Sequence, residues 1–547
     1  MTSLKGCLMR KKFSFVTVMM LVVLSLAAGA MLNNVFSSDN IYEQITKFKD
    51  VLSVTEKYYV DDVDTQKLTE GAIAGLLEQL DPHSTYISAA DLRRVHEEFQ
   101  GSFEGIGIEY QVLNDTLMVV APIIGGPSES LGILAGDKIL KIGDTSAIGI
   151  TQIGVQKKLR GPKGTTVHVS ILRVGLEELL EFDITRDKIP LRTVSAAFMI
   201  DDRSGYVQVT RFSAKTHDEL LEAVNKLSAE GMKRLILDLR SNAGGYLDQA
   251  FRMVDEFLPR GRKVVYTKGR RPEFDDEYVS SGSGRLLGAP LIVLVDNSSA
   301  SASEIVAGAI QDWDRGLIVG ETTFGKGLVQ KEFPLKDSSA FRLTTARYYT
   351  PSGRLIQRAY GSDRLSYTRQ AFERNEAEGE NVSHEVERDS SLPVFKTLDL
   401  GRTVYGGGGI TPDYIVKADR LTEYTAHLRG RNIFLEFANK YADQHTNGLK
   451  EQYGTDISRF VSDFEVTSEM QDHIIGLARA RNIEFKKELF EKDLTFIKAL
   501  AKAHLARRIW GNEAFSRVML SVDTQFQEGV ALFPEAEKIS RDLSSIR

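Results

Sequence analysis

The pattern of apolar and polar positions divides the chain after its first 38 residues into four parts. Residues 39–99 carry apolar side chains at helical spacing, and residues 100–187 carry short alternating runs separated by glycine turns, which predict helices followed by a small β-rich domain. In residues 188–419, β-branched runs typical of buried strands alternate with amphipathic helices, so we expect an α/β core with a largely parallel sheet. Residues 420–547 carry almost no strand signal and predict a helical C-terminal extension. The expected fold is multidomain α/β.

One stretch of the expected core departs from this pattern. Residues 361–392 are highly polar, with Glu373, Glu376, Glu378 and Glu380 close together. A segment of this composition buries too little apolar surface to order itself. We therefore interpret it as a mobile surface insertion in the core.

Residues 1–38 have the composition of a targeting segment. Four basic residues up to Lys12 precede an apolar run from Phe13 to Leu32, and Ala28–Ala30 offers a cleavage site. The run is also about long enough to span a bilayer, so a signal peptide and an uncleaved membrane anchor both remain open. In either case the basic residues before the apolar run stay on the cytoplasmic side of the membrane. We expect the rest of the chain in the periplasm, either free or anchored to the inner membrane.

Composition argues against several classes of protein. The formal charge of -6 provides no basic field that would attract nucleic acid. The nine histidines form no pair at metal-ligand spacing, and the chain has one cysteine, Cys7, so neither a metal cluster nor a disulfide scaffold is expected. Cleavage after the targeting segment would leave the exported part without a thiol, which excludes a cysteine nucleophile. We expect no metal and no cofactor.

Two stretches near the middle of the chain carry candidate chemistry. Ser299–Glu304 lies between a strand pattern, Pro290–Asp296, and a helical pattern that runs to Asp312. At such a turn the first N–H groups of the helix lack partners and face the positive end of its dipole, which suits a nucleophilic oxygen and the oxyanion that it generates. Gly320–Gly327 carries Lys326 in a glycine-rich turn. A lysine acts as a general base at neutral pH where burial or nearby positive charge lowers its pKa.

Two other interpretations of these stretches remain open. A run of small serine and alanine residues is also typical of a tight turn with a helix cap and no chemistry. Gly320–Lys326 also fits the phosphate-binding loop of P-loop nucleotide hydrolases. Gly327 argues against that loop, because a serine or threonine that holds magnesium belongs there, and Glu321 would turn a carboxylate toward a triphosphate.

Together the two stretches resemble the carboxy-terminal processing peptidases of family S41, which are tail-specific serine proteases of bacterial envelopes and chloroplasts. The resemblance covers residues from about 40 to 416. It implies that Ser301 is the nucleophile and that Lys326, 25 residues later, is its base. It also implies that Gln330, one helical turn beyond the lysine, holds the amine in place.

The resemblance extends to the residues around this pair. The glycine pair at Gly244 and Gly245 follows a predicted strand, and the resemblance implies that the N–H groups of Gly245 and Ala302 stabilise the oxyanion. Asp312 matches a supporting position of the family, although an aspartate at a helix end is also typical of a solvated charge or a cap. His83 could form a triad with Ser301. It lies next to a proline in a turn, however, where histidine is usually structural, and Lys326 already supplies a base.

The β-rich part resembles a PDZ domain. The residues that resemble its carboxylate-binding loop are Gly105, Ile106, Gly107 and Ile108. A free strand edge that pairs with an extended peptide, and loop N–H groups that receive its carboxylate, would suit a tail-specific enzyme. An ordinary small β-rich domain is the alternative. Arg160, at the end of the helix that would border the groove, either contacts the substrate, relays its binding, or is a solvated charge.

The sequence therefore predicts an exported serine endopeptidase. It would bind the C-terminal tails of protein substrates through a PDZ domain and cleave peptide bonds with a Ser301–Lys326 dyad through an acyl-enzyme. A homodimer through the helical segments and an activating adaptor are further expectations. The alternative from another class is a non-catalytic PDZ scaffold with a protease-like core, and the intact Ser301, Lys326 and Gln330 argue against it.

Overall fold

The computed structural model describes residues 19–20, 24–25, 41–361, 363–377 and 392–546. The chain forms two compact units, Met1–Gln79 and Leu80–Arg547. The predicted targeting segment, residues 1–38, lies outside the described residues except for the two short pieces within it. Within the described ranges, none of the helices combines the length and the apolar composition that a membrane span needs.

The described part of the first unit contains the helices α2 (Ile41–Tyr58) and α3 (Thr65–Glu78), as the sequence predicts. The Asp64 carboxylate accepts the backbone N–H groups of Gln66 and Lys67 at the start of α3, which satisfies donors that lack partners within the helix. No residue of α2 is buried. Five of its apolar side chains are 45–65% exposed, namely Ile41, Ile45, Phe48, Val51 and Val54.

The core of the second unit is a six-stranded sheet. Its strands, in spatial order, are β10 (Val194–Met199), β11 (Ser204–Val209), β12 (Arg234–Asp238), β15 (Leu291–Val295), β16 (Leu317–Gly320) and β21 (Tyr414–Ile415). β10 runs antiparallel to β11, and the remaining neighbours are parallel. The prediction of a largely parallel sheet is confirmed.

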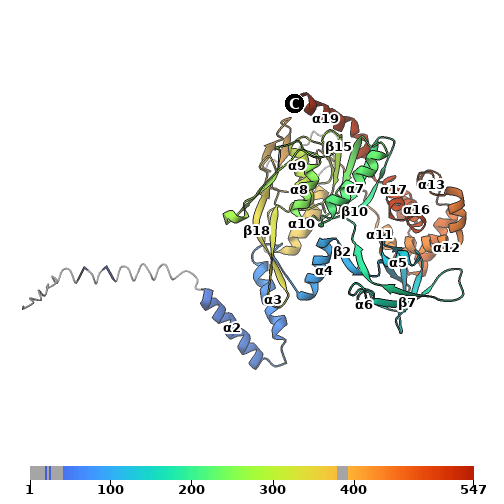
Figure 1. Cartoon of the computed structure of the whole chain (residues 1–547), viewed down its shortest axis with the longest axis horizontal. Helices are drawn as coiled ribbons and strands as arrows, with labels where there is room; N and C mark the ends of the chain where they lie inside the picture. The colour runs from blue at the N-terminus through green and yellow to red at the C-terminus, as the bar shows by residue number, and fades with distance from the viewer. Residues whose placement is uncertain (1–18, 21–23, 26–40, 362, 378–391, 547) are drawn as a thin grey trace, which may run out of the picture. The chain divides into compact units, whose positions relative to one another are not determined.

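Helices cover both faces of this sheet (Figure 1). Side chains of α7 (Thr216–Ala229), α8 (Leu247–Asp255) and α9 (Ala302–Asp312) pack on one face. The other face packs against the end of the helical extension. The helices there are α17 (Asn512–Leu520), α18 (Thr524–Ala531) and α19 (Phe533–Ile546). Because strand side chains alternate between faces, β12 sends Leu235 and Leu237 to the first layer and Ile236 to the second. The extension is thus one of the two layers that cover the core.

A second, antiparallel sheet lies beside the core and has five strands. They are β1 (Thr85–Ile87), β13 (Lys263–Gly269), β14 (Glu277–Val279), β17 (Leu328–Pro334) and β18 (Ala340–Tyr349). The sequence predicts that Asp81–Tyr86 interrupts the helical pattern of residues 39–99, but it does not predict the strand β1, which precedes the helix α4 (Ala89–Gln100). β1 pairs with β18, about 250 residues away, and such a long-range pairing leaves no periodic signal in a three-residue strand.

The interpretation of residues 361–392 as a mobile insertion is wrong for part of the stretch. Arg364–Ala377 forms the helix α10, while residues 378–391 lie outside the described residues. Tyr367 and Ala371 of this helix are buried. They stand one helical turn apart, on the same face. Two apolar residues at this spacing anchor the helix, although the composition of the whole stretch is polar. A short hairpin of β19 (Val394–Lys396) and β20 (Thr403–Tyr405) follows.

The β-rich domain precedes the core in sequence and has its own apolar core. Its sheet runs in the order β3 (Ile108–Leu113), β4 (Thr116–Pro122), β5 (Lys138–Ile142), β7 (Thr166–Leu172) and β8 (Leu180–Thr185), with β6 (Thr145–Ser146) paired to β5. The helices α5 (Pro127–Ser130) and α6 (Gln152–Leu159) complete it. β3 is an edge strand of the sheet. A separate ladder of β2 (Ser102–Gly105) with β9 (Asp187–Pro190) joins the domain to the rest.

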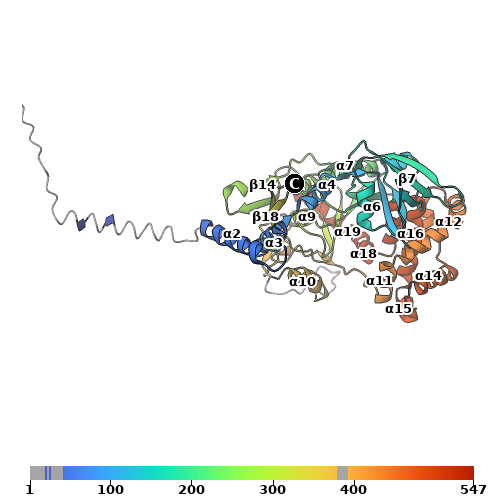
Figure 2. The same ribbon diagram turned by 90° about the horizontal axis from the view of Figure 1, so that it is seen from below.

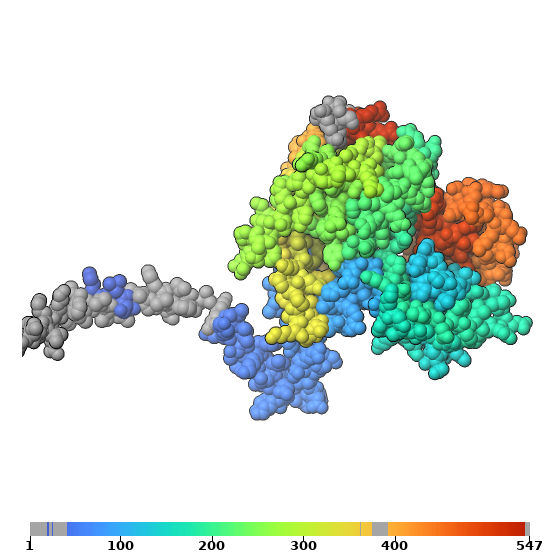
Figure 3. Space-filling view, viewed as in Figure 1, coloured from blue at the N-terminus to red at the C-terminus, as the bar shows by residue number. Residues whose placement is uncertain are grey.

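The extension is helical, as predicted, and has its own apolar core. Before α17 it consists of α11 (Glu423–Gly430), α12 (Ile433–Tyr453), α13 (Ile457–Asp463), α14 (Ser468–Ala480), α15 (Lys487–Lys492) and α16 (Leu494–Trp510). Figures 1 and 2 both show α12 and α16 beside the β-rich domain, and Figure 3 shows the extension (orange to red) against that domain (teal) and the core (green). Leu435 packs on Met118 and Val120 there, and Arg507 forms an ion pair with Glu109.

Candidate active site

Ser301 lies on the turn between β15 and α9, where the sequence predicts a strand-to-helix turn. It precedes the first residue of α9 and has φ 56° and ψ -110°. Positive φ is uncommon for a residue other than glycine and stores strain of order 1–3 kcal/mol. The backbone N–H of Ser301 donates to Glu304 Oε2 at 2.7 Å. The turn is also fixed from outside, because the Ala300 N–H donates to the Asn242 carbonyl oxygen at 3.0 Å.

The loop after β12 lies directly against this turn. Gly244 has φ 98° and Gly245 has φ 148°. A β-carbon at Gly244 would lie 2.7 Å from the Ala300 carbonyl oxygen and 2.8 Å from Ser301 Cβ, so this position has no room for a side chain. Within the part of the chain that the structure describes, the N–H groups of Gly245 and Ala302 donate no hydrogen bond. Both are therefore available to a developing oxyanion.

Lys326 lies in the loop between β16 and β17, and its amine is held from one side. Nζ donates to Gln330 Oε1 at 2.9 Å, and Gln330 Nε2 donates in turn to the His83 carbonyl oxygen. Gln330 stands on β17, so the expected helical turn between it and the lysine is wrong. Burial and the charge of Arg342 lower the pKa of Lys326, and the charge of Glu304 opposes this in part. The shift has the direction that a lysine base needs.

No hydrogen bond joins the side chains of Ser301 and Lys326 among the described residues, but two buried groups tie their backbones together. Glu304 Oε2 accepts the N–H of Ser301 at 2.7 Å and the N–H of Lys326 at 2.9 Å. The Tyr348 hydroxyl lies 3.0 Å from the Ser301 carbonyl oxygen and 2.6 Å from that of Lys326. Glu304 and Tyr348 therefore fix the spacing between the loop that carries Ser301 and the loop that carries Lys326.

The Glu304 carboxylate is fully buried and serves both loops. Its other oxygen accepts the Gly325 N–H at 2.7 Å and the Thr323 hydroxyl at 2.6 Å. Burial raises the pKa of Glu304, and its hydrogen bonds oppose that rise. Three of its four partners are backbone N–H groups, which can only donate, so the ionised form suits this site. The sequence analysis missed the role of Glu304, although its position three residues after Ser301 is the spacing of a capping box.

Three other candidate residues lie in ordered contacts. Asp312 is buried at the end of α9 and pairs with Arg354 at 2.5 Å, so the alternative of a solvated charge is wrong. Arg160 is not simply solvated either, because it pairs with Glu97 of α4 at 2.8 Å. His83 Nε2 lies 3.2 Å from the Tyr367 hydroxyl. Burial and the charge of Lys326 lower the pKa of His83 to about 4, so its imidazole is neutral at physiological pH.

The loop from Gly105 to Ile108 lies apart from Ser301. Its residues Ile106, Gly107 and Ile108 line a cavity of about 1750 Å³ together with residues of α6, β10 and the extension. The lining includes the start of the edge strand β3, the α6 residues Val155 and Leu159, and residues 507–513 of the extension. Neither Ser301 nor Lys326 lines this cavity. Among the described residues, no group of three or more His, Cys, Asp or Glu side chains could hold a metal ion.

Comparison with known proteins gives three family matches. Residues 203–362 match Peptidase family S41, residues 25–90 match the activating protease CtpB N-terminal domain, and residues 424–511 match a family of unknown function, DUF8443. Among curated proteins, the carboxy-terminal-processing protease of Bartonella bacilliformis is 40% identical over 325 residues, which are 59% of this chain and 74% of the relative.

Solved structures are also similar to parts of the chain. The photosystem II D1 C-terminal processing protease is 30% identical and covers 57% of this chain and 89% of its own, with a TM-score of 0.32. The PDZ domain of a carboxy-terminal protease from Vibrio cholerae, solved in complex with a peptide, is 31% identical and covers 16% of this chain and 99% of its own, with a TM-score of 0.16.

Proposed function

The chain belongs to the carboxy-terminal processing proteases of peptidase family S41, which are serine peptidases, and we propose that it cleaves peptide bonds with a Ser301–Lys326 dyad through an acyl-enzyme. One observation carries the proposal: the Glu304 carboxylate binds the backbones of both residues through the same oxygen. The nucleophile loop and the lysine loop are thereby built as one unit. The lowered pKa of Lys326 supports its role as the base.

The chemistry follows from these positions. The neutral Lys326 amine takes the proton of Ser301 Oγ as that oxygen bonds to the peptide carbonyl carbon. The carbonyl electron pair moves onto oxygen, where the N–H groups of Gly245 and Ala302 stabilise it. When the intermediate collapses, the C–N bond breaks and the leaving amine takes the proton from Lys326. Water, activated by the same lysine, then releases the acyl group. Gln330 Oε1 accepts a hydrogen bond from Lys326 Nζ and so holds the amine in place.

We propose that the β-rich domain, in its role as a PDZ domain, binds the C-terminal tails of protein substrates. Two features support this. β3 is an edge strand of its sheet, and an extended peptide can add to such an edge through main-chain hydrogen bonds. Residues of β3 and α6 line the same cavity as Gly107 of the loop. Arg160, at the end of α6, pairs with α4 and would relay tail binding to the rest of the protein.

Two proposals concern the assembly and the place of the protein. The exposed apolar side chains of α2 support a homodimer through the helical segments, because a row of exposed apolar residues marks an interaction surface. The basic and apolar composition of residues 1–38 supports export to the periplasm, with the segment either cleaved or kept as an anchor. An activating adaptor stays a prediction.

The test is degradation of an unfolded reporter protein, with and without an added apolar C-terminal tail. We expect the parent protein to cleave the tailed reporter faster, the Ser301→Ala and Lys326→Ala variants to be inactive, and the Lys336→Ala variant, which loses an exposed lysine, to behave like the parent. Cleavage that survives both dyad substitutions would refute the dyad. Equal cleavage of both reporters would refute tail recognition, and a parent without activity would favour the scaffold alternative.

A further inference from the structure

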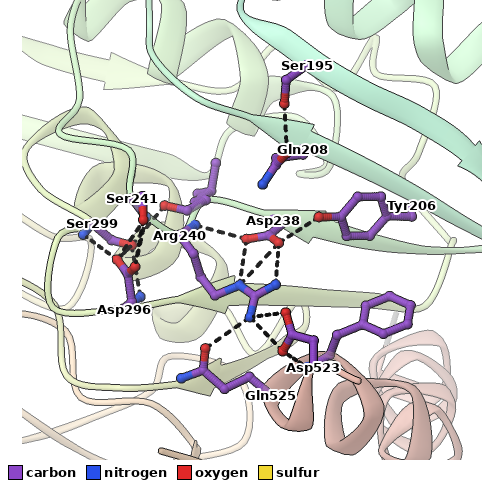
Figure 4. Close-up of polar contacts among 12 residues, drawn as sticks. Ser195, Tyr206, Gln208, Asp238, Arg240, Ser241, Asp296, Ser299, Asp523 and Gln525 are labelled. Atoms are coloured by element: carbon purple, nitrogen blue, oxygen red, sulfur yellow. Dashed lines mark hydrogen bonds and ion pairs between the residues drawn. The ribbon is translucent and has the colours of Figure 1, made fainter. Parts of the chain in front are cut away.

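Arg240 joins the core sheet to the C-terminal extension. It follows β12 at the start of the loop that leads to Gly245. Its Nη2 donates to Asp238 Oδ2 at 2.7 Å, and its Nη1 donates to Asp523 Oδ1 at 2.9 Å and to Gln525 Oε1 at 3.0 Å (Figure 4). Asp523 and Gln525 stand at the start of α18, almost 300 residues away in the sequence. The guanidinium is therefore clamped between the strand and the extension.

The clamp is charged and largely buried. The side chain of Arg240 is 14% exposed and that of Asp523 is 25% exposed, while Asp238 is fully buried. Asp238 also accepts the Tyr206 hydroxyl at 2.7 Å. Burial disfavours the charge of Arg240, but the two carboxylates outweigh it and raise the pKa of the guanidinium. Two negative groups thus face one positive group, and the second of them comes from the extension.

The loop after Arg240 connects it to the proposed active site and is held by several hydrogen bonds. Ser241, the next residue, has φ 57° and donates its N–H to both carboxylate oxygens of Asp296 at 2.9 Å. Asp296 follows β15 and also accepts the Ser299 N–H at 2.9 Å, beside the nucleophile. Asn242 Oδ1 then accepts the N–H of Gly244 at 2.9 Å. The backbone that leads from Arg240 to the glycine pair is therefore fixed by hydrogen bonds at Ser241 and at Gly244.

Asp523 and Gln525, the two residues of the extension that bind Arg240, are themselves held in place by further contacts. Asp523 accepts the Phe526 N–H at 3.0 Å and so caps α18, and Gln525 Nε2 donates to the Val416 carbonyl oxygen at 2.8 Å. The Phe526 ring packs edge-on against Tyr206 with the ring centroids 5.6 Å apart. Asp523 and Gln525 lie outside the ranges that match peptidase family S41 and the family of unknown function. They therefore belong to a part of the chain to which no family match assigns a role.

We propose that Asp523 and Gln525 are positioning residues for peptide cleavage: they hold Arg240 and thereby fix the loop that presents the Gly245 N–H to the oxyanion. The inference rests on the oxyanion role of Gly245 in the proposed function. Because the tail-binding cavity includes neither Arg240 nor Asp523, the clamp acts on the chemical step and not on substrate binding. The C-terminal extension is then a working part of the catalytic centre.

The test compares two neutralised carboxylates of the extension in the full-length protein. Asp523→Asn removes the charge but keeps a side chain that caps helices equally well. Its matched control is Glu537→Gln: Glu537 of α19 is also 25% exposed and pairs at 3.2 Å with Arg234, at the opposite end of the same strand, β12. We expect Asp523→Asn to lower kcat about tenfold, less than the roughly 10²–10³-fold that loss of an oxyanion donor costs. KM should stay unchanged, and Glu537→Gln should keep the parent's kcat.

A second readout separates a positioning role from a merely structural one. Ser301 Oγ adds to the carbonyl carbon of a peptide aldehyde as its proton passes to Lys326, and the carbonyl oxygen becomes an oxyanion in the same site. We expect its inhibition constant to rise in Asp523→Asn by the factor by which kcat/KM falls, and to stay constant in Glu537→Gln. Gln525→Met, which removes the other acceptor of Nη1, should act in the same direction. Thermal unfolding of each variant sets an assay temperature at which all are folded.

The outcomes distinguish this inference from the function on which it rests. If the parent is active and Ser301→Ala is inactive, but Asp523→Asn matches Glu537→Gln in kcat and in aldehyde binding, the positioning role is wrong and the dyad stands. If Ser301→Ala keeps the parent's activity, the dyad and the positioning role both fall. A fall in kcat with matching loss of aldehyde affinity, confined to Asp523→Asn and Gln525→Met, supports the inference.

Discussion

Replacing Gly244 by alanine tests how closely the glycine loop and the nucleophile turn are packed. The new β-carbon would lie 2.7 Å from the Ala300 carbonyl oxygen, 2.8 Å from Ser301 Cβ and 2.9 Å from the Ala302 nitrogen. All three atoms belong to the turn that holds Ser301, the proposed nucleophile, and Ala302, a proposed oxyanion donor. The substitution therefore pushes directly on the proposed catalytic centre.

The size of the effect follows from these distances. The 2.7 Å contact is 0.7 Å shorter than the 3.4 Å at which ordinary van der Waals contact begins, so the two loops must separate by about that amount. A displacement of about 1 Å in a catalytic group can cost 10²-fold in rate, and we expect kcat to fall about 10²-fold. The positive φ of 98° adds backbone strain of order 1–3 kcal/mol to the loss of stability.

Gly261→Ala is the matched control. Gly261 has φ 84°, and a β-carbon there meets nothing within 4 Å, so the variant has the backbone strain without the collision. The assay measures kcat on a tailed peptide and the free energy of unfolding in denaturant for both variants. We expect both to lose stability and only Gly244→Ala to lose kcat. If the two variants keep the same kcat, the close packing between this loop and Ser301 has no bearing on catalysis.

Three further substitutions test the surroundings of the dyad. Arg342→Gln removes a positive charge that lowers the pKa of Lys326, so the pKa of Lys326 should rise. Because the neutral amine is the active form, the rising limb of the kcat/KM profile should move to higher pH. An unchanged pH profile would contradict this. Gln330→Ala removes the acceptor 2.9 Å from Lys326 Nζ. It should lower kcat about tenfold, as loss of a charged hydrogen bond of about 1.5 kcal/mol predicts. An unaltered kcat would show that the hydrogen bond from Lys326 to Gln330 has no bearing on catalysis. Arg354→Met leaves Asp312 buried without its counter-charge. It should lower the free energy of unfolding, measured by denaturant titration, by about 3–5 kcal/mol. A negligible loss would mean that the pair is not buried in solution.

The parts that the sequence predicts well are those with local signals. A β-branched run, a cluster of small residues and a helical pattern follow one another around Ser301, and the structure has β15, the turn and α9 in that order. The same holds for β16 and the glycine-rich loop of Lys326. Neighbouring residues decide these elements, because buried strands and helix starts each have a characteristic composition.

The parts that escape prediction depend on distant residues. Tyr348 contacts the backbones of both dyad residues from β18, and nothing in its neighbourhood indicates that role. The sequence shows that the extension has apolar helix faces, but the apolar face of a helix does not indicate which surface it packs against. In the structure Phe526 and Phe533 pack on the core sheet, and this contact depends on tertiary packing alone.

The most direct test of the central claim is covalent labelling with a fluorophosphonate, in which the attacking serine oxygen displaces fluoride from phosphorus. Peptide mapping should find the label on Ser301, and the labelling rate should rise with pH through a midpoint below the ordinary lysine pKa of 10.5. Lys326→Ala should abolish that rise, while Lys336→Ala should keep it. A label on another residue, or a pH dependence that persists in Lys326→Ala, would contradict the Ser301–Lys326 dyad.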